Sequence, residues 1–237
     1  MTAKVIFRQL FEKESSTFSY LLGCKRTRKA ILIDPVDITA ARDAEIIRDL
    51  NLNLAYAINT HVHADHITGT HNLRAHFPEV KTGLGSGAKI AKSDEKFPHL
   101  HILTVGDISL EVRHTPGHTN GCVTYVEHKM GLVFTGDAVL IRGCGRTDFQ
   151  EGSAATLYKS VMEQIWTLPD HFMIYPAHDY KGRTVSSVDE EKRLNPRLTK
   201  KKDEFIQIMN NLNLPYPKKI DLALPWNINC GAEPLEK

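Results

Sequence analysis

The chain has 237 residues, of which 41% are hydrophobic and 24% charged, so it is long enough to bury a sizeable core and has an ordinary globular composition. Its formal net charge of +2 is too small to indicate binding to nucleic acid or to an acidic membrane, and no apolar run is long enough for a transmembrane helix. The four cysteines form no C-x-x-C pair, which argues against a disulfide framework or a cysteine-type zinc site and favours a reducing compartment.

The predicted elements begin with short strands. An apolar run at 30–33 ends in Asp34-Pro35, a dipeptide that stops a strand. Residues 78–99 are polar and rich in glycine, so we expect a surface loop with a short helix near Lys89–Lys92. In chain order, the remaining expected strands are 5–11, 18–22, 54–58, 102–105, 108–114, 122–126, 132–135 and 173–175. The expected helices are 38–50, 67–77, 157–166 and 205–212, and the capping-box sequence 187–190 is expected to open another.

Strands dominate the first part of each half, and helices follow them. This pattern predicts an α/β protein, a four-layer αβ/βα sandwich of two mixed β-sheets. No linker or internal repeat divides the chain, so we expect one domain over 1–237 with a short C-terminal extension from about residue 195 to 237.

One short stretch after the predicted strand at 54–58 concentrates metal-binding chemistry. Its candidate ligands are His61, His63, Asp65 and His66. Imidazole and carboxylate together favour zinc, iron or manganese over calcium or magnesium. In a loop at a strand end such side chains can point in several directions, so the first two can serve one metal position while the last two turn toward a second.

Three further candidate ligands each follow an apolar run. His118 comes after a turn forced by Pro116-Gly117, while Asp137 and His178 also stand just beyond strand-like sequence. A lone histidine at such a place would be weak support, because surface histidines are common. Four strand ends in succession that all carry ligand chemistry predict a metal centre.

With these residues in place, the chain resembles the metallo-β-lactamase superfamily over nearly its whole length, which implies the same sandwich fold. The superfamily motif matches His61, His63, Asp65, His66, His118, Asp137 and His178. Within it the chain is similar to two glutathione-using branches, the hydroxyacylglutathione hydrolases (glyoxalase II) and the persulfide dioxygenases of the ethylmalonic encephalopathy protein type. The stretches 141–150, 175–180 and 195–199 favour the second branch, and the short tail after Arg197 leaves little room for the helical C-terminal domain of typical glyoxalase II.

The resemblance implies one Fe(2+) per chain, held by His61, His118 and Asp137 as catalytic metal ligands, with three coordination positions left open for a thiolate and dioxygen. The other four motif residues, His63, Asp65, His66 and His178, would then orient ligands or move protons. From the residues alone, all seven can equally hold two Zn2+ ions that activate a hydroxide for thioester hydrolysis. The sequence leaves both arrangements open.

The implied reaction oxidises glutathione persulfide with O2 to sulfite and glutathione, in sulfide catabolism. Because the tripeptide carries two carboxylates, we expect Arg197 and Arg146 as cationic contacts and Tyr180 as a hydrogen-bond donor. Arg146 has an alternative role as an ion-pair partner of Asp148. We interpret Cys144, which lies between two glycines, as a packing residue and not as a catalytic thiol.

Two other functions compete with the iron-dependent persulfide dioxygenase: a dizinc hydroxyacylglutathione hydrolase, and more remotely a non-catalytic binding protein on the same fold. The complete ligand set argues against the second. We expect no nucleic-acid or membrane partner, and the oligomeric state stays open, with a homodimer as one option. The resemblance suggests the mitochondrial matrix, although no clear presequence is visible and the cytoplasm is the alternative.

Overall fold

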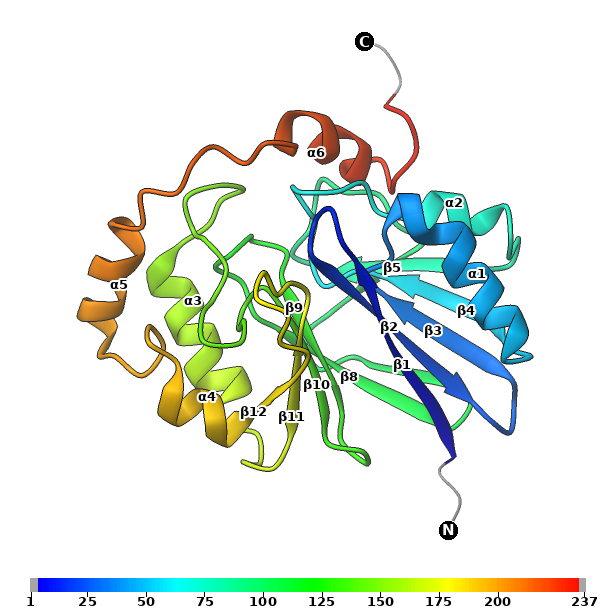
Figure 1. The fold of residues 1–237 in the computed structure, drawn as a ribbon, viewed down its shortest axis with the longest axis horizontal. Helices are drawn as coiled ribbons and strands as arrows, with labels where there is room; N and C mark the ends of the chain where they lie inside the picture. Colours follow the sequence, from blue (N-terminus) through cyan, green and yellow to red (C-terminus); the bar gives the residue numbers. More distant parts are fainter. Residues whose placement is uncertain (1–3, 235–237) are drawn as a thin grey trace.

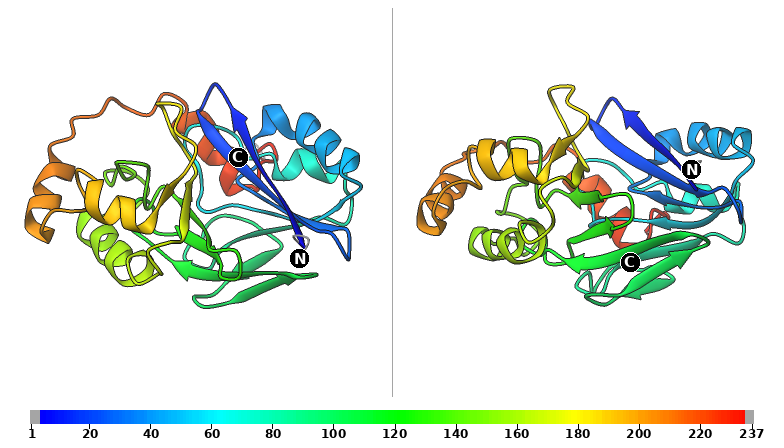
Figure 2. Two further views of the ribbon diagram at one scale, coloured as in Figure 1. Left: turned by 60° about the horizontal axis from the view of Figure 1, so that its bottom comes forward. Right: turned by 90° about the horizontal axis from the view of Figure 1, so that it is seen from below.

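In this computed structural model, which describes residues 4–234, two six-stranded β-sheets pack face to face between outer helices (Figures 1 and 2). The strand order is β1-β2-β3-β4-β5-β6 in the first sheet and β12-β11-β10-β9-β8-β7 in the second, and both sheets mix parallel and antiparallel pairs. The predicted four-layer sandwich is therefore confirmed. The strands are β1 (Val5–Glu12), β2 (Thr17–Cys24), β3 (Lys29–Ile33), β4 (Asn53–Ile58), β5 (Lys81–Gly85), β6 (Glu95–Phe97), β7 (Ile102–Val105), β8 (Ile108–His114), β9 (Val123–Glu127), β10 (Leu132–Gly136), β11 (Met173–Pro176) and β12 (Ser186–Ser187).

Alternate residues of the strands supply two hydrophobic layers. Tyr20 on β2 and Ile33 on β3 face the second sheet and pack with Phe134 of β10. Their chain neighbours Leu21 and Leu32 point the other way, against α1 and α2. Successive side chains of a strand point to opposite faces, so a strand that is apolar on both faces must be covered on both sides.

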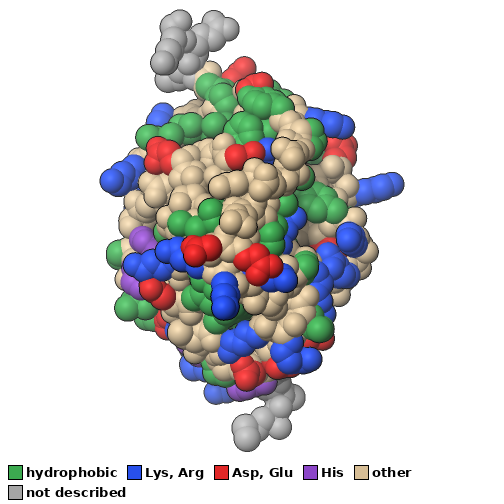
Figure 3. Space-filling view, turned by 90° about the vertical axis from the view of Figure 1, so that its left-hand side faces the viewer, with side chains coloured by type: hydrophobic (Ala, Val, Ile, Leu, Met, Phe, Trp, Pro, Cys, Tyr) green, Lys and Arg blue, Asp and Glu red, His purple; other side chains and the backbone are tan. Residues whose placement is uncertain are grey.

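The helices complete the outer layers. On the first sheet lie α1 (Ala40–Asp49) and α2 (Thr70–Arg74), and on the second lie α3 (Ala154–Ser160, continued by a π-helical turn Val161–Ile165), α4 (Val188–Leu194) and α5 (Lys202–Asn210) (Figure 1). Ser187 caps α4 by accepting a hydrogen bond from Glu190 N at 3.1 Å, as its capping-box sequence predicts. Over this side of the molecule, Lys and Arg alternate with Asp and Glu, without a continuous patch of one sign (Figure 3).

Parts of the structure differ from the prediction. Residues 78–99 contain β5 and β6, not only a loop, and residues 89–92 form turns and not a helix. The helix expected over 67–77 is limited to α2. A further helix, α6 (Ile220–Ile228), lies within the extension from residue 195 and was not predicted. Within residues 4–234, no helix is both long and apolar enough to cross a bilayer.

The topology brings four strand ends together. In the second sheet β8 and β10 run parallel to each other on either side of β9, and β11 runs parallel to β10, so all three end at the same edge. The loop after β4 reaches this edge from the first sheet, as the contact of Thr60 O with Val123 N at 2.8 Å shows. Candidate ligands that are far apart in the sequence therefore meet at the seam between the sheets.

Candidate metal centre

Two groups of ligand-type side chains meet at this seam. In the first group, one ligand atom each of His61, His118 and Asp137 lies within 4.8 Å of the others. The second group, under the same limit, consists of His63, Asp65, His66 and His178. The structure thus brings all seven predicted residues together and divides them as a three-residue and a four-residue set.

The orientation of His61 is set by its neighbour Thr60 and by Asp34. The Thr60 hydroxyl donates to Asp34 Oδ2 at 2.9 Å, so it accepts the hydrogen of His61 Nδ1, also at 2.9 Å. This assignment puts the His61 proton on Nδ1 and leaves the Nε2 lone pair free. Asp34 is fully buried and also accepts from Thr60 N at 2.7 Å, so the whole turn after β4 is tied to one carboxylate.

His118 is oriented in the same sense by a main-chain carbonyl. Its Nδ1 donates to the carbonyl oxygen of Arg146 at 2.7 Å, which leaves Nε2 directed toward Asp137 Oδ2, at 3.6 Å. Gly145 lies against both ligands, because a Cβ at this position would come within 2.8 Å of the His118 ring and of Asp137 O. Only glycine allows the backbone to approach the two residues so closely.

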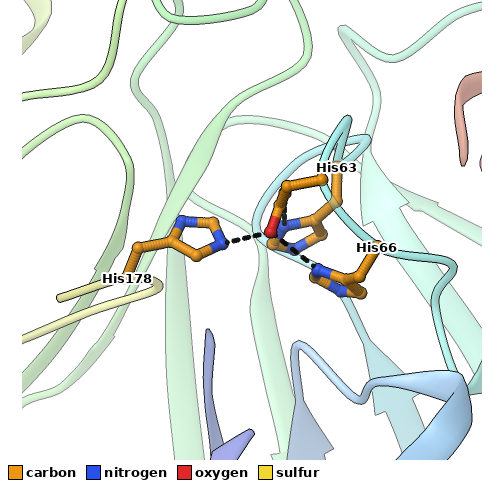
Figure 4. Close-up of side chains that lie close together, drawn as sticks. His63, His66 and His178 are labelled. Carbon is orange, nitrogen blue, oxygen red and sulfur yellow. Dashed lines mark hydrogen bonds and ion pairs between the residues drawn. The ribbon is translucent and has the colours of Figure 1, made fainter. Parts of the chain in front are cut away.

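His178 links the two groups. Its Nδ1 lies 2.7 Å from Asp137 Oδ1 and its Nε2 lies 3.0 Å from Asp65 Oδ2, so both ring nitrogens donate to carboxylates. Figure 4 shows His178 approaching from the side opposite to His63 and His66, with dashed lines from the three rings to the one carboxylate between them, that of Asp65. Burial alone would lower the pKa of His178, but the two carboxylates hold it well above its ordinary range.

The second group contains two buried nitrogens that make no hydrogen bond within the described part of the chain, His63 Nδ1 and His66 Nε2. His63 donates from Nε2 to Asp34 Oδ1 at 3.1 Å, which again leaves the other nitrogen free as an acceptor. Buried polar atoms without partners are rare and call for an explanation such as an ion or a water. The chemistry of both groups therefore fits divalent metal.

The electrostatics of the site favour the protonation states that metal binding requires. Burial, with repulsion from His63, lowers the pKa of His61 well below its ordinary range, so its imidazole is neutral at physiological pH. Burial alone would raise the pKa of the Asp137 carboxyl, but His178 and then His118 bring it below its ordinary range. Neutral imidazoles beside an ionised carboxylate are the ligand forms that a divalent cation binds.

The predicted substrate contacts lie at different places around the site. The guanidinium of Arg146 makes a two-pronged contact with Asp148, 2.7 Å to each carboxylate oxygen, so the alternative role weighed from the sequence is the one observed. Arg197 donates to Cys144 O at 3.2 Å and forms no ion pair among residues 4–234. The Tyr180 side chain is exposed, and its ring lies parallel to that of His178 with the centroids 6.1 Å apart.

Asp34 is the site residue that the sequence analysis treated only as the end of a strand. Asp34 directly follows β3, and β3 pairs with β4, the strand that carries the histidine loop. This pairing would have indicated that Asp34 lies beside the loop. Its backbone has φ of 51°, a left-handed conformation that Asp tolerates better than most residues.

Comparison with known proteins gives a consistent result. Residues 13–198 match the family described as the metallo-beta-lactamase superfamily. The chain is 54% identical to the mitochondrial persulfide dioxygenase ETHE1 of Homo sapiens, over 98% of this chain and 91% of that protein. It is 33% identical to a probable hydroxyacylglutathione hydrolase of Schizosaccharomyces pombe, over 71% of this chain and 66% of that protein. The crystal structure of ETHE1 from Myxococcus xanthus superimposes with a TM-score of 0.91 at 48% identity, over 96% of this chain and 100% of that one.

Proposed function

Because the chain belongs to the metallo-beta-lactamase superfamily and within it to the persulfide dioxygenases, we propose that it oxidises glutathione persulfide with dioxygen at a single iron(II). The observation that carries this proposal is the 54% identity to a persulfide dioxygenase over 98% of the chain, against 33% over 71% for the hydrolase relative.

Iron would be held by His61, His118 and Asp137, whose free acceptor atoms converge in the first ligand group. When bound, iron(II) in such a two-histidine, one-carboxylate site supplies adjacent open positions for a sulfur and for dioxygen. The second group would hold an ion only in the two-zinc alternative, and in the structure its member His178 bonds to Asp137 and Asp65.

The surrounding residues of the chain orient the three ligands and keep their binding atoms free of protons. Asp34, acting through Thr60, and the carbonyl of Arg146 hold the protons of His61 and His118 away from the metal side. His178 holds one oxygen of Asp137 and leaves the other for the metal. Arg197, which has no carboxylate partner among residues 4–234, would bind a glutathione carboxylate.

The overall reaction is glutathione persulfide plus dioxygen plus water, giving glutathione and sulfite. The S–S bond breaks, the outer sulfur is oxidised, and dioxygen accepts the electrons. The test is anaerobic reconstitution with iron(II), followed by measurement of oxygen uptake and sulfite release with glutathione persulfide. We expect equal amounts of oxygen consumed and sulfite formed. Hydrolysis of S-lactoylglutathione by the zinc-loaded protein, without persulfide-dependent oxygen uptake, would instead establish the hydrolase.

The persulfide dioxygenases ETHE1 of Mus musculus and Homo sapiens are named as mitochondrial proteins, and on this ground we propose the mitochondrial matrix as the compartment of this enzyme. Fluorescence microscopy of the tagged full-length protein, with cytoplasmic staining as the contrary outcome, tests this assignment.

A further inference from the structure

A residue of the C-terminal extension reaches back to the histidine loop. Asn227, in the last turn of α6, is 4% exposed and lies beyond residues 13–198, which match the superfamily. Its Nδ2 donates to His63 O and to His66 O, each at 2.8 Å, and its Oδ1 accepts from Thr68 N at 2.8 Å. One amide side chain thus satisfies three main-chain groups of the loop.

These three groups depend on Asn227. The loop after β4 is neither helix nor strand over residues 59–66, so its main chain cannot satisfy itself by a regular pattern. Within residues 4–234, no other hydrogen bond involves His63 O, His66 O or Thr68 N. An unpaired polar group in such a buried place would be unfavourable, so the loop conformation depends on a partner with two donors and one acceptor.

The contact continues along the chain after Asn227. Thr70 Oγ1 donates to Cys230 O at 2.9 Å, and Lys92 N donates to Ile228 O at 2.7 Å. Gly231 lies so close to the loop that a Cβ there would come within 2.4 Å of Thr68 O. The end of α6 and the residues that follow it are therefore packed against the histidine loop, the start of α2 and Lys92, and are not a surface appendage.

We infer that Asn227 is a positioning residue for the metal centre. It fixes the segment His63–Thr68, so that Asp65 meets His178 at 3.0 Å and His178 in turn meets Asp137 at 2.7 Å. The effect reaches the metal through this chain of hydrogen bonds, since Asn227 itself bonds only to main-chain atoms. The inference rests on the proposed function only in taking this cluster as a metal centre.

The test compares Asn227→Asp and Asn227→Ser with a matched control. Aspartate keeps the shape but has no donors, while serine has one donor in place of two and still offers an acceptor, on a shorter side chain. Asn229→Asp makes the same chemical change two residues away, where the amide donates to Glu233 O at 2.8 Å and accepts from Lys92 Nζ at 2.8 Å. The control leaves the contacts to the histidine loop untouched.

Metal affinity is measured by chelator competition, with iron(II) under anaerobic conditions and in parallel with zinc(II). The loss of an outer contact that orients ligands typically costs about 10- to 100-fold, and we expect this for Asn227→Asp and a smaller loss for Asn227→Ser. Thermal unfolding with and without metal gives a second readout, because weaker binding to the folded state must reduce the metal-induced rise in Tm.

A purely structural role would lower the Tm of the metal-free and metal-loaded proteins equally and leave the affinity unchanged. That result for Asn227→Ser, the milder change, would overturn the inference, and so would an equal loss of affinity in Asn229→Asp. Failure of the proposed function looks different: wild-type protein would bind zinc and lack persulfide-dependent oxygen uptake, while the Asn227 variants would still bind metal more weakly.

Discussion

Replacing Asp34 by Asn should weaken metal binding about 10- to 100-fold, even though Asp34 belongs to neither ligand group. The carboxylate accepts three hydrogens, from Thr60 N at 2.7 Å, Thr60 Oγ1 at 2.9 Å and His63 Nε2 at 3.1 Å. Asp34 Oδ1 accepts from Thr60 N and His63 Nε2, so an amide that keeps its oxygen there turns its NH2 donor toward Thr60 Oγ1. The variant therefore cannot satisfy all three donors without moving a proton elsewhere.

The location of that proton decides the outcome. If the new amide donates to Thr60 Oγ1, the Thr60 hydroxyl hydrogen turns to His61 Nδ1, and the His61 proton must move to Nε2, the atom that would bind metal. A 10- to 100-fold loss corresponds to about 1.4–2.8 kcal/mol at 25 °C. This is comparable to the cost of about 1–3 kcal/mol for one buried group without its hydrogen bond.

The assay is chelator competition for iron(II), combined with 15N NMR of the imidazoles in the metal-free protein to identify the tautomer of His61. Asp43→Asn is the matched control, because Asp43 is also fully buried but bonds to Arg42 and Thr39 on the outer side of the first sheet. It should lower stability and leave affinity unchanged. Unaltered affinity in Asp34→Asn, or an unaltered His61 tautomer, would refute this account of how the ligand is prepared.

Substitutions at four other residues test separate parts of the site. Asp137→Ala removes the proposed anionic ligand and should abolish iron binding, whereas His63→Ala should weaken iron binding about 10- to 100-fold. If metal analysis showed complete loss of iron in both variants, His63 would belong among the ligands. Arg197→Ala should lower kcat/KM for glutathione persulfide about 10- to 100-fold with iron content unchanged, because a charged hydrogen bond contributes about 1.5–3 kcal/mol. Arg197→Lys should recover part of this loss, and normal kinetics in Arg197→Ala would assign Arg197 to a structural role. Burial raises the pKa of the Cys144 thiol to about 11, so the thiol is not ionised at neutral pH and Cys144→Ala should turn over near the wild-type rate. Alkylation of the native thiol should accelerate only as the pH approaches that value, and loss of turnover in Cys144→Ala with iron retained would contradict a packing role for Cys144.

The positions of the candidate ligands could be predicted because each follows a strand whose apolar residues are contiguous in the sequence. The strands β5 and β6 could not be predicted in the same way. Gly83 and Gly85 weaken the strand pattern of β5, yet the structure requires glycine there, since a Cβ at Gly83 would come within 2.4 Å of the Phe97 ring and one at Gly85 within 2.3 Å of Val123. Such close approaches depend on tertiary packing, which the local sequence does not contain.

The roles of Asp34 and Asn227 were missed for a related reason. Each acts by hydrogen bonds to residues distant in sequence, and neither stands in a spacing pattern typical of a metal site. The helix that carries Asn227 is apolar on most sides and contains Pro225, so it lacks the amphipathic periodicity that identified α1 and α5. The sequence can therefore indicate the residues that bind, but not the residues that hold the binders in place.

The seating of α6 on the histidine loop also bears on when the site forms during synthesis. The histidine loop leaves the ribosome early, but Asn227 follows His66 by 161 residues, and His178 follows Asp65 by 113. A nascent chain that has exposed only the first sheet carries four of the seven ligand-type residues without the contacts that shape them. We therefore expect metal loading to be a late event, after the C-terminal segment has closed on the loop.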